Sequence, residues 1–267
     1  MAFAPKPIPI RPLTIGDYEA WLYTVHGIDL PSLENWYTSV VEKVRHDFEN
    51  SQFWHKLMED LSDFDAEYSL TKGFSLRSNG PPKLVIKPFL SFVDKTLRKN
   101  ILENNHFPNP PPGGWLLPNN WNSRINDLVR TFFVAKYLDG VGFLVEKIKS
   151  SCMPHSYHFD VAFEAREEGY YAAHINVRRL FEIPRYDVGT EKVEMSIEIQ
   201  ITTQLQEVIK ALLHKFYEQN RMKTVTDEPK WKWDYESDEF AMNYLGHILH
   251  YIEGMIMDIR KRQGVKK

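Results

Sequence analysis

The stretch VEMSIEIQITTQLQEVIKALLHKFY, residues Val193–Tyr217, decides the fold because its pattern changes from that of a strand to that of a helix. Apolar and polar residues alternate in its first half, which predicts a strand with one face in a core. Thr202 and Thr203 then offer a helix cap, and apolar residues recur at helical spacing. Glu198 and Gln200 therefore share the polar face of a strand that ends just before a helix. The pattern alone is equally typical of a solvated sheet surface.

The composition indicates a globular protein with no general affinity for nucleic acid. The chain has 267 residues, enough for one large domain with helical additions. Hydrophobic residues make up 43% and charged residues 26%, as in ordinary soluble proteins. The net charge of −3 means that any basic surface must be local.

The single cysteine and the lengths of the apolar stretches indicate the cellular compartment in which the protein is expected. Cys152 excludes an intramolecular disulfide and fits a reducing compartment, and we interpret it as a packing residue rather than a nucleophile. No stretch reads as a signal peptide or approaches the roughly 18 apolar residues of a membrane span. We therefore expect a cytoplasmic protein that does not associate with membranes.

Residues 83–100, KLVIKPFLSFVDKTLRKN, combine a short β-prone piece with a helical pattern after Pro88. Lys87, Ser91 and Lys95 recur every four residues, a spacing that places side chains on one face of a helix. This basic stripe with one hydroxyl group suits phosphate binding, although a solvated amphipathic helix has the same pattern.

The segment Ile125–Tyr137 is rich in branched and aromatic residues and predicts a strand, with Asp127 at its start and Arg130 within it. Further strands are predicted at Tyr157–Phe163 and Tyr170–Phe181.

Tyr170 and His174 stand near the start of the last of these strands. A tyrosine and a histidine on a strand are commonly packing residues, so the pattern alone assigns them no chemistry. A terminal helix is predicted over Glu236–Arg262. Its His247 and His250 lack an identifiable third ligand, so no zinc site is expected there.

Four segments, in the same order along the chain, resemble motifs of the RelA/SpoT-type alarmone synthetases. Lys87, Ser91 and Lys95 occupy the last three fixed places of the family's RxKxxxSxxxK segment. Asp127 is similar to the aspartate of its DIxGxR motif. The other two likenesses are Gly169–His174 to GYRSLH, and Glu198–Ile201 with Leu212–Tyr217 to EIQIRT and LEHKxxYK.

The resemblance implies an α+β, nucleotidyltransferase-like fold. We expect a mixed sheet of about five strands flanked by helices, with N- and C-terminal helical extensions. The expected parts are an N-terminal arm with helices in residues 1–70, a synthetase domain in residues 71–220 and a C-terminal helical extension in residues 221–267.

The resemblance also implies roles for individual residues. Asp127 and Glu198 would be the catalytic carboxylates that hold Mg²⁺, and Glu198 would activate a ribose 3′-hydroxyl. The implied contacts to the ATP donor are Lys87, Ser91, Lys95 and Arg130, and those to the acceptor nucleotide are Tyr170, His174 and Gln200.

The chain departs from the motifs at four places. Val85 and Phe132 stand where the family has arginines, and Arg77 or Lys83 could replace the first of these. The other two departures are Thr202 for an arginine and Leu213 for a glutamate.

Three functions therefore remain open. The first is transfer of pyrophosphate from ATP to GDP or GTP, and the second is transfer to the 3′ end of tRNA, as in toxic relatives. The local basic residues Arg178, Arg179, Lys230 and Lys232 allow the second function. The third is a non-catalytic domain that binds nucleotide or a partner protein. An antitoxin protein and a second copy of the chain are further candidate partners.

Overall fold

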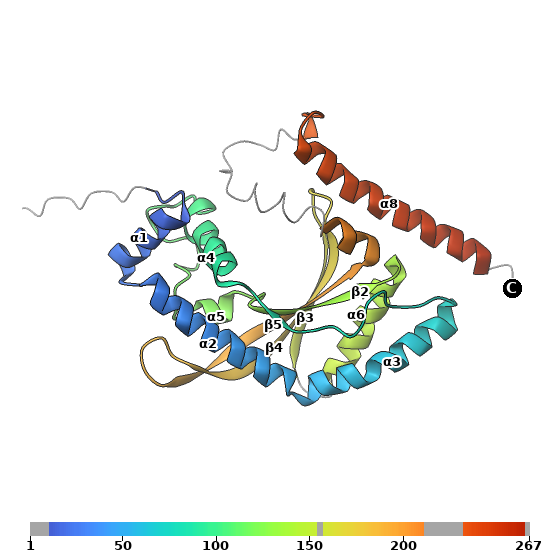
Figure 1. Cartoon of the computed structure of the whole chain (residues 1–267), viewed down its shortest axis with the longest axis horizontal. Coiled ribbons are helices and arrows are strands. Elements are labelled where there is room, and N and C mark those ends of the chain that lie inside the picture. Colours follow the sequence, from blue (N-terminus) through green and yellow to red (C-terminus); the bar gives the residue numbers. More distant parts are fainter. Residues whose placement is uncertain (1–10, 154–156, 211–231, 265–267) are drawn as a thin grey trace, which may run out of the picture.

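The computed structural model describes residues 11–153, 157–210 and 232–264 (Figure 1). The helices are α1 (Ile15–His26), α2 (Leu30–Glu49), α3 (Gln52–Lys72), α4 (Phe89–Leu97), the π-helical turn η1 (Arg98–Leu102), α5 (Trp121–Arg124), α6 (Leu138–Cys152) and α8 (Asp238–Gly264). The strands are β1 (Val85–Ile86), β2 (Val129–Ala135), β3 (His158–Ala165), β4 (Tyr171–Pro184) and β5 (Thr190–Thr203).

The strands form a five-stranded mixed sheet in the order β1-β2-β5-β4-β3. Strands β2 and β5 pair in parallel, and the other neighbours pair antiparallel. The predicted α+β architecture, with a mixed sheet of about five strands between helices, is confirmed.

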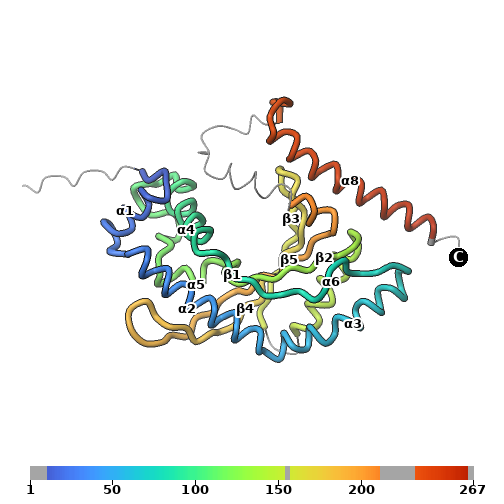
Figure 2. The backbone as a smooth tube through the Cα atoms, in the orientation of Figure 1, coloured from blue at the N-terminus to red at the C-terminus, as the bar shows by residue number. Residues whose placement is uncertain are grey.

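The apolar residues of β5 form the centre of the core. Ile197, Ile199 and Ile201 are fully buried, and helices α5 and α6 pack against this strand. Helix α2 packs against β4 and α3 packs against α6. Helices α2, α3, α5 and α6 therefore cover one face of the sheet. Figure 2 shows α2 and α3 below the sheet and α8 above it. The alternation of residues along β5 thus fixes which face meets the helices.

Local capping sets the ends of the N-terminal helices. Asp29 accepts a hydrogen bond from the backbone N–H of Ser32 at the start of α2, and Ser51 caps α3 in the same way. Gly73 ends α3 in the left-handed conformation that glycine adopts without strain. Apolar residues recur at helical spacing along α2, and Tyr37, Val40 and Val44 are buried.

The basic stripe predicted in residues 83–100 does not lie on one helix. Lys87 precedes α4, which starts after Pro88, whereas Ser91 and Lys95 lie within α4. Tyr37 of α2 donates a hydrogen bond to the backbone carbonyl of Lys87 at 2.6 Å and so fixes this connection. The four-residue spacing identified two lysines, Lys87 and Lys95, that converge on Asp127. They converge because the chain bends before α4 and not because they lie on one helix.

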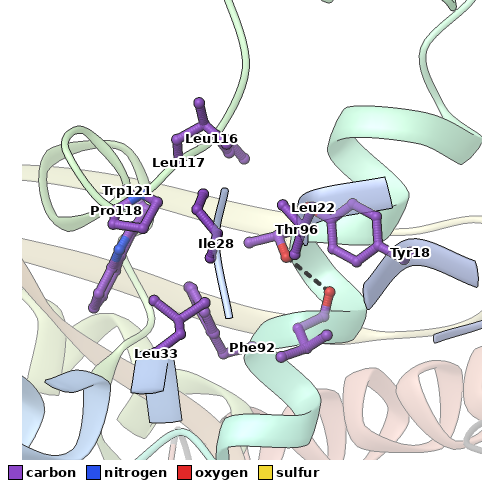
Figure 3. Close-up of a pocket in the computed structure, with 11 residues that line it drawn as sticks. Tyr18, Leu22, Ile28, Leu33, Phe92, Thr96, Leu116, Leu117, Pro118 and Trp121 are labelled. Atoms are coloured by element: carbon purple, nitrogen blue, oxygen red, sulfur yellow. Dashed lines mark hydrogen bonds between the residues drawn. The ribbon is translucent and has the colours of Figure 1, made fainter. Parts of the chain in front are cut away.

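An apolar hollow between α1, α2 and α4 is shown in Figure 3. Its lining includes Tyr18, Phe92 and Trp121, and its volume of about 10 Å³ compares with a single water-sized sphere. The hollow is too small for a nucleotide. In the described part of the chain, no helix has the length and apolar character that crossing a membrane requires.

Candidate active site

The face of the sheet turned away from α2 and α6 carries the predicted site residues. The register pairs Arg130 with Glu198, and His174 with Gln200, so the four side chains share one face of β2, β5 and β4. This face is not a solvated sheet surface. Glu198 is 8% exposed and His174 7% exposed. Buried polar groups at such positions require partners. The polar residues of the site form two clusters, and within each cluster the side chains contact one another.

The first cluster surrounds Asp127, in the turn before β2. Lys87 Nζ lies 2.9 Å from Oδ2 of Asp127, and Lys95 Nζ lies 2.8 Å from Oδ1. Burial alone would raise the pKa of Asp127, but the two ammonium groups outweigh it and lower the pKa to about 2. Burial lowers the pKa of Lys87, and Asp127 partly offsets that effect. The cluster holds an ionised carboxylate between two lysines.

The second cluster is a chain of hydrogen bonds through Glu198. Its Oε1 lies 2.9 Å from Nδ1 of His174, and its Oε2 accepts a hydrogen bond from Gln200 at 2.6 Å. Burial acts to raise the pKa of Glu198, but the contacts with His174 and Gln200 outweigh it and lower the pKa. Because an ionised carboxylate only accepts, Nδ1 of His174 carries the proton. The hydroxyl of Tyr170 lies 3.0 Å from Nε2 of His174, which is then free to accept from it.

Arg130 lies between the two positions at which the family motifs have arginine. Val85 is its partner on β1, and Phe132 follows two residues later on the same face. The guanidinium carbon lies 5.3 Å from the centre of the Phe132 ring. Nε of Arg130 is buried and has no hydrogen-bond partner within the described chain.

Of the two replacements suggested from sequence for the arginine at Val85, Arg77 is held in an ion pair elsewhere and the side chain of Lys83 lies at the surface. Arg77 donates to both carboxylate oxygens of Asp65. Arg130 is the cation that the fold brings next to Val85.

Sequence reasoning missed Lys210, in the helical residues that follow β5. Its Nζ donates to Oε1 of Gln200 at 3.3 Å and lies 4.6 Å from the centre of the Phe132 ring. Helical periodicity after β5 predicted the helix, but it gave no indication that this lysine turns back over the strand.

Several other predicted residues have structural roles or fall outside the described part. Ser91 lies half-buried on α4, one turn before Lys95. Cys152 is fully buried, and burial raises the pKa of its thiol to about 12, as expected for a packing residue. Lys230 and the LEHKxxYK-like segment, Leu212–Tyr217, lie outside the described residues.

The histidines of α8 contact the side chain of Tyr171. Nδ1 of His247 lies 2.8 Å from the hydroxyl of Tyr171, and the His250 ring stacks on the Tyr171 ring with centres 3.7 Å apart. Within the described ranges, no three histidine, cysteine, aspartate or glutamate residues are grouped so as to hold a metal ion.

A two-carboxylate magnesium site is nevertheless compatible with the residues present. Mg²⁺ commonly binds one or two carboxylates and completes its shell with substrate phosphates and water. Asp127 and Glu198 are hard oxygen ligands, and Asp127 is near enough to raise the pKa of Glu198 against the stronger hydrogen bonds. Their present partners are lysine, histidine and glutamine side chains, which an ion would have to displace or share.

Comparisons with known proteins give a consistent structural likeness. No family model and no curated protein matches the sequence. Small alarmone synthetase 1 from Bacillus subtilis superposes with a TM-score of 0.50 at 15% identity, covering 79% of this chain and 91% of that chain. The structure of that synthetase bound to its product pppGpp gives 0.50 at 15% identity, covering 78% and 91%.

A GTP pyrophosphokinase family protein from Streptococcus pneumoniae is also similar, with a TM-score of 0.48 at 14% identity, covering 88% of this chain and 96% of that chain. At such low sequence identities a superposition shows the fold and not the activity. The two superpositions on small alarmone synthetase 1 show that the chain has the RelA/SpoT-type synthetase fold of the small alarmone synthetases.

Proposed function

We propose that the protein is a pyrophosphokinase that transfers the terminal pyrophosphate of ATP to the 3′-hydroxyl of GDP or GTP. The observation that carries the proposal is the proximity of two clusters. Lys87–Asp127–Lys95 lies just before β2, and Tyr170–His174–Glu198 lies on the sheet, near enough for the charge of Asp127 to act on Glu198. The first is a charged seat for phosphate, and the second holds an ionised carboxylate. The fold likeness to a synthetase whose structure holds its product pppGpp supports the same reaction.

In this reaction the 3′-oxygen of the acceptor bonds to the β-phosphorus of ATP while the bond from that phosphorus to the α-phosphate oxygen breaks, and AMP leaves. Lys87 and Lys95 would bind the phosphates and offset their charge. Glu198 would accept the proton of the attacking hydroxyl, since each of its oxygens retains a lone pair beside its present hydrogen bond. A bound Mg²⁺, held by Asp127 and Glu198, would neutralise phosphate charge.

On the acceptor side, Tyr170 offers one face of its ring for a base. Arg166 lies 5.2 Å from the ring centre and occupies part of its surroundings. His174 and Gln200 fix the orientation of Glu198 through their hydrogen bonds, so we assign them a positioning role toward the acceptor hydroxyl. Free nucleotides as substrates agree with a cytoplasmic location.

The described basic residues give little support to a tRNA acceptor. Arg178 is paired with Asp160 at 2.7 Å and Lys232 with Glu167 at 2.9 Å. Phosphate contacts to a nucleic acid would have to compete with these pairs. The tRNA acceptor and the non-catalytic domain are therefore retained as outcomes of the test below.

The test incubates the purified chain and MgCl₂ with ATP labelled at the β-phosphate, together with GDP, GTP, tRNA or no acceptor, and separates the products by chromatography. We expect label in the guanosine nucleotide and AMP in equal amount. Glu198→Gln should abolish transfer, because it removes the proton acceptor with little change in size. Glu194→Gln is the matched control, since Glu194 lies on the same strand with a half-exposed side chain, and it should retain activity.

The outcomes separate the three functions. Label found only in tRNA would show that the acceptor is the 3′ end of tRNA and not GDP or GTP. Nucleotide binding by calorimetry without any transfer would leave a non-catalytic binding domain and refute the proposed reaction.

A further inference from the structure

Among the described residues of the site, four cations lie along the first half of β2. Lys87 and Lys95 meet at Asp127 before the strand begins, Arg130 lies on the strand, and Lys210 lies over the ring of Phe132. Residues on one face of a strand advance by about 6.6 Å per pair, so these groups form an extended row. A row of positive groups matches a linear polyanion better than a single carboxylate.

Arg130 and Lys210 approach the same aromatic ring. Their charged groups lie 5.3 Å and 4.6 Å from the centre of Phe132, both within the usual cation–π distance. No ion pair joins either cation to a carboxylate among the residues that the structure describes, and Lys210 donates to the neutral amide of Gln200. The ring holds two cations side by side without an anion between them.

This arrangement is unfavourable without a ligand. Burial lowers the pKa of Lys210 and the charge of Arg130 lowers it further, and the carboxylates of Glu198 and Glu207 offset only part of this. Arg130 also acts on Lys87 in the same direction. An anion bound between these groups would offset their mutual repulsion and the cost of their burial.

We propose that Lys210, which lies with Arg130 against the ring of Phe132, is a further contact to the phosphate groups of the donor nucleotide and supplies the positive charge that position 132 lacks. The assignment of the ligand as a nucleoside triphosphate rests on the proposed function. Lys210 also connects the proposed phosphate site to the carboxylate of Glu198. It donates a hydrogen bond to Gln200, Gln200 donates to Glu198, and Glu198 contacts His174. Lys210 is thus a binding residue that no motif in the sequence indicated.

The experiment measures binding of a non-hydrolysable ATP analogue with Mg²⁺ by titration calorimetry. Lys210→Met and Lys210→Gln should each weaken binding by about 10- to 150-fold, the range for loss of a charged hydrogen bond. Lys210→Arg should stay within about threefold of the unmodified chain, a difference of under 0.7 kcal/mol. Lys43→Met is the control, because Lys43 pairs with Asp47 on the exposed surface of α2, and it should bind normally.

The decisive variant is the double substitution Lys210→Met with Phe132→Arg, which moves the charge from the helix to the strand. Recovery of at least most of the lost affinity is expected, and it would not follow if Lys210 acted only through packing. Melting temperatures identify variants that fail to fold. Comparing Lys210→Met with Lys210→Gln shows whether a loss of binding comes from the missing charge or from the particular side chain introduced.

The results distinguish this inference from the proposed function. Normal analogue binding by both Lys210→Met and Lys210→Gln, together with a loss in Lys95→Met, would overturn the role of Lys210 and leave the donor site intact. Absence of analogue binding by the unmodified chain would overturn both. Inorganic tripolyphosphate, tested in parallel, should show the same order of variants, since the seat recognises phosphate and not the base.

Discussion

At the scale of single residues, Tyr170 combines two properties that can be separated. Its hydroxyl reaches His174 at 3.0 Å, and burial raises its pKa, so the hydroxyl stays protonated and donates. Its ring is neither fully buried nor free, with Arg166 near it. The hydroxyl therefore acts on the Glu198 chain, whereas the ring is available to an acceptor base.

Replacing Tyr170 by Phe should lower kcat about 2- to 12-fold, since one neutral hydrogen bond to His174 is lost, with little change in KM for the acceptor. Tyr170→Ala should also raise the acceptor Kd about 5- to 150-fold, because a stacking ring is removed. Steady-state kinetics and acceptor titration measure the two effects.

Tyr171→Phe is the matched control for Tyr170. It removes a hydroxyl that also meets a histidine, but that histidine is His247 on α8, so kcat should not change. A large fall in melting temperature for Tyr170→Ala with unchanged acceptor affinity would make Tyr170 a packing residue and contradict the stacking role.

At the scale of elements, Asp127 joins α4 and the β1–α4 connection to the start of β2 through Lys95 and Lys87. Its carboxylate has a pKa of about 2 in the fold, against 3.8 for an unperturbed aspartate. A lowered folded-state pKa means stabilisation that is present above about pH 4 and is lost as the pH falls toward 2. The pair therefore stabilises the fold in addition to any role in binding.

Urea unfolding from pH 7 down to pH 2.5 should show this loss, amounting to about 2 kcal/mol from Asp127 alone. Asp127→Asn should lack that part of the pH dependence. At pH 7 it should be less stable by about 3–5 kcal/mol, because Lys87 would be left buried without its partner.

Asp160→Asn provides the control for Asp127, since the pair of Asp160 with Arg178 is largely exposed and should contribute under about 1 kcal/mol. Equal pH profiles for Asp127→Asn and the unmodified chain would contradict the assigned ion pair.

At the scale of the whole molecule, the last helix, α8, passes beside the turn between β3 and β4 (Figure 1). Gly169 in this turn has φ +74°, and a Cβ on either Gly169 or Gly246 of α8 would collide with the backbone of the other. The two glycines allow contact of backbone with backbone. The contacts of Tyr171 with His247 and His250 then secure α8 beside the segment that carries Tyr170.

Gly246→Ala should therefore separate α8 from the turn and lower the melting temperature, with faster hydrogen exchange in both α8 and the β3–β4 turn. Gly254→Ala on the same helix is the control, since nothing lies within 4 Å of a Cβ there. It should be neutral or stabilising by about 0.5–1 kcal/mol, the helix preference of alanine over glycine. Identical exchange in the two variants would refute the glycine contact.

Most strands and the terminal helix could be predicted from local patterns in the sequence, whereas the roles of the site residues came from the resemblance to family motifs. Alternation in β5 gave the face on which Glu198 and Gln200 lie, because side-chain direction along a strand has a period of two. Helical spacing gave the terminal helix, expected over Glu236–Arg262 and formed as α8, because this signal depends only on near neighbours. The strand expected over Ile125–Tyr137 is shorter, Val129–Ala135, because its first residues form the turn that directs Asp127 toward the lysines.

The tertiary structure decided which charges meet. Arg130 lies beside Val85 and Phe132, and Lys210 lies over that ring, through contacts between segments far apart in the sequence. It also decided that Glu198 and His174 are buried, whereas the pattern allowed a solvated surface. Local periodicity states only that a face is polar. Whether that face is buried, and which cation completes it, depends on the long-range packing that positions each element against the sheet.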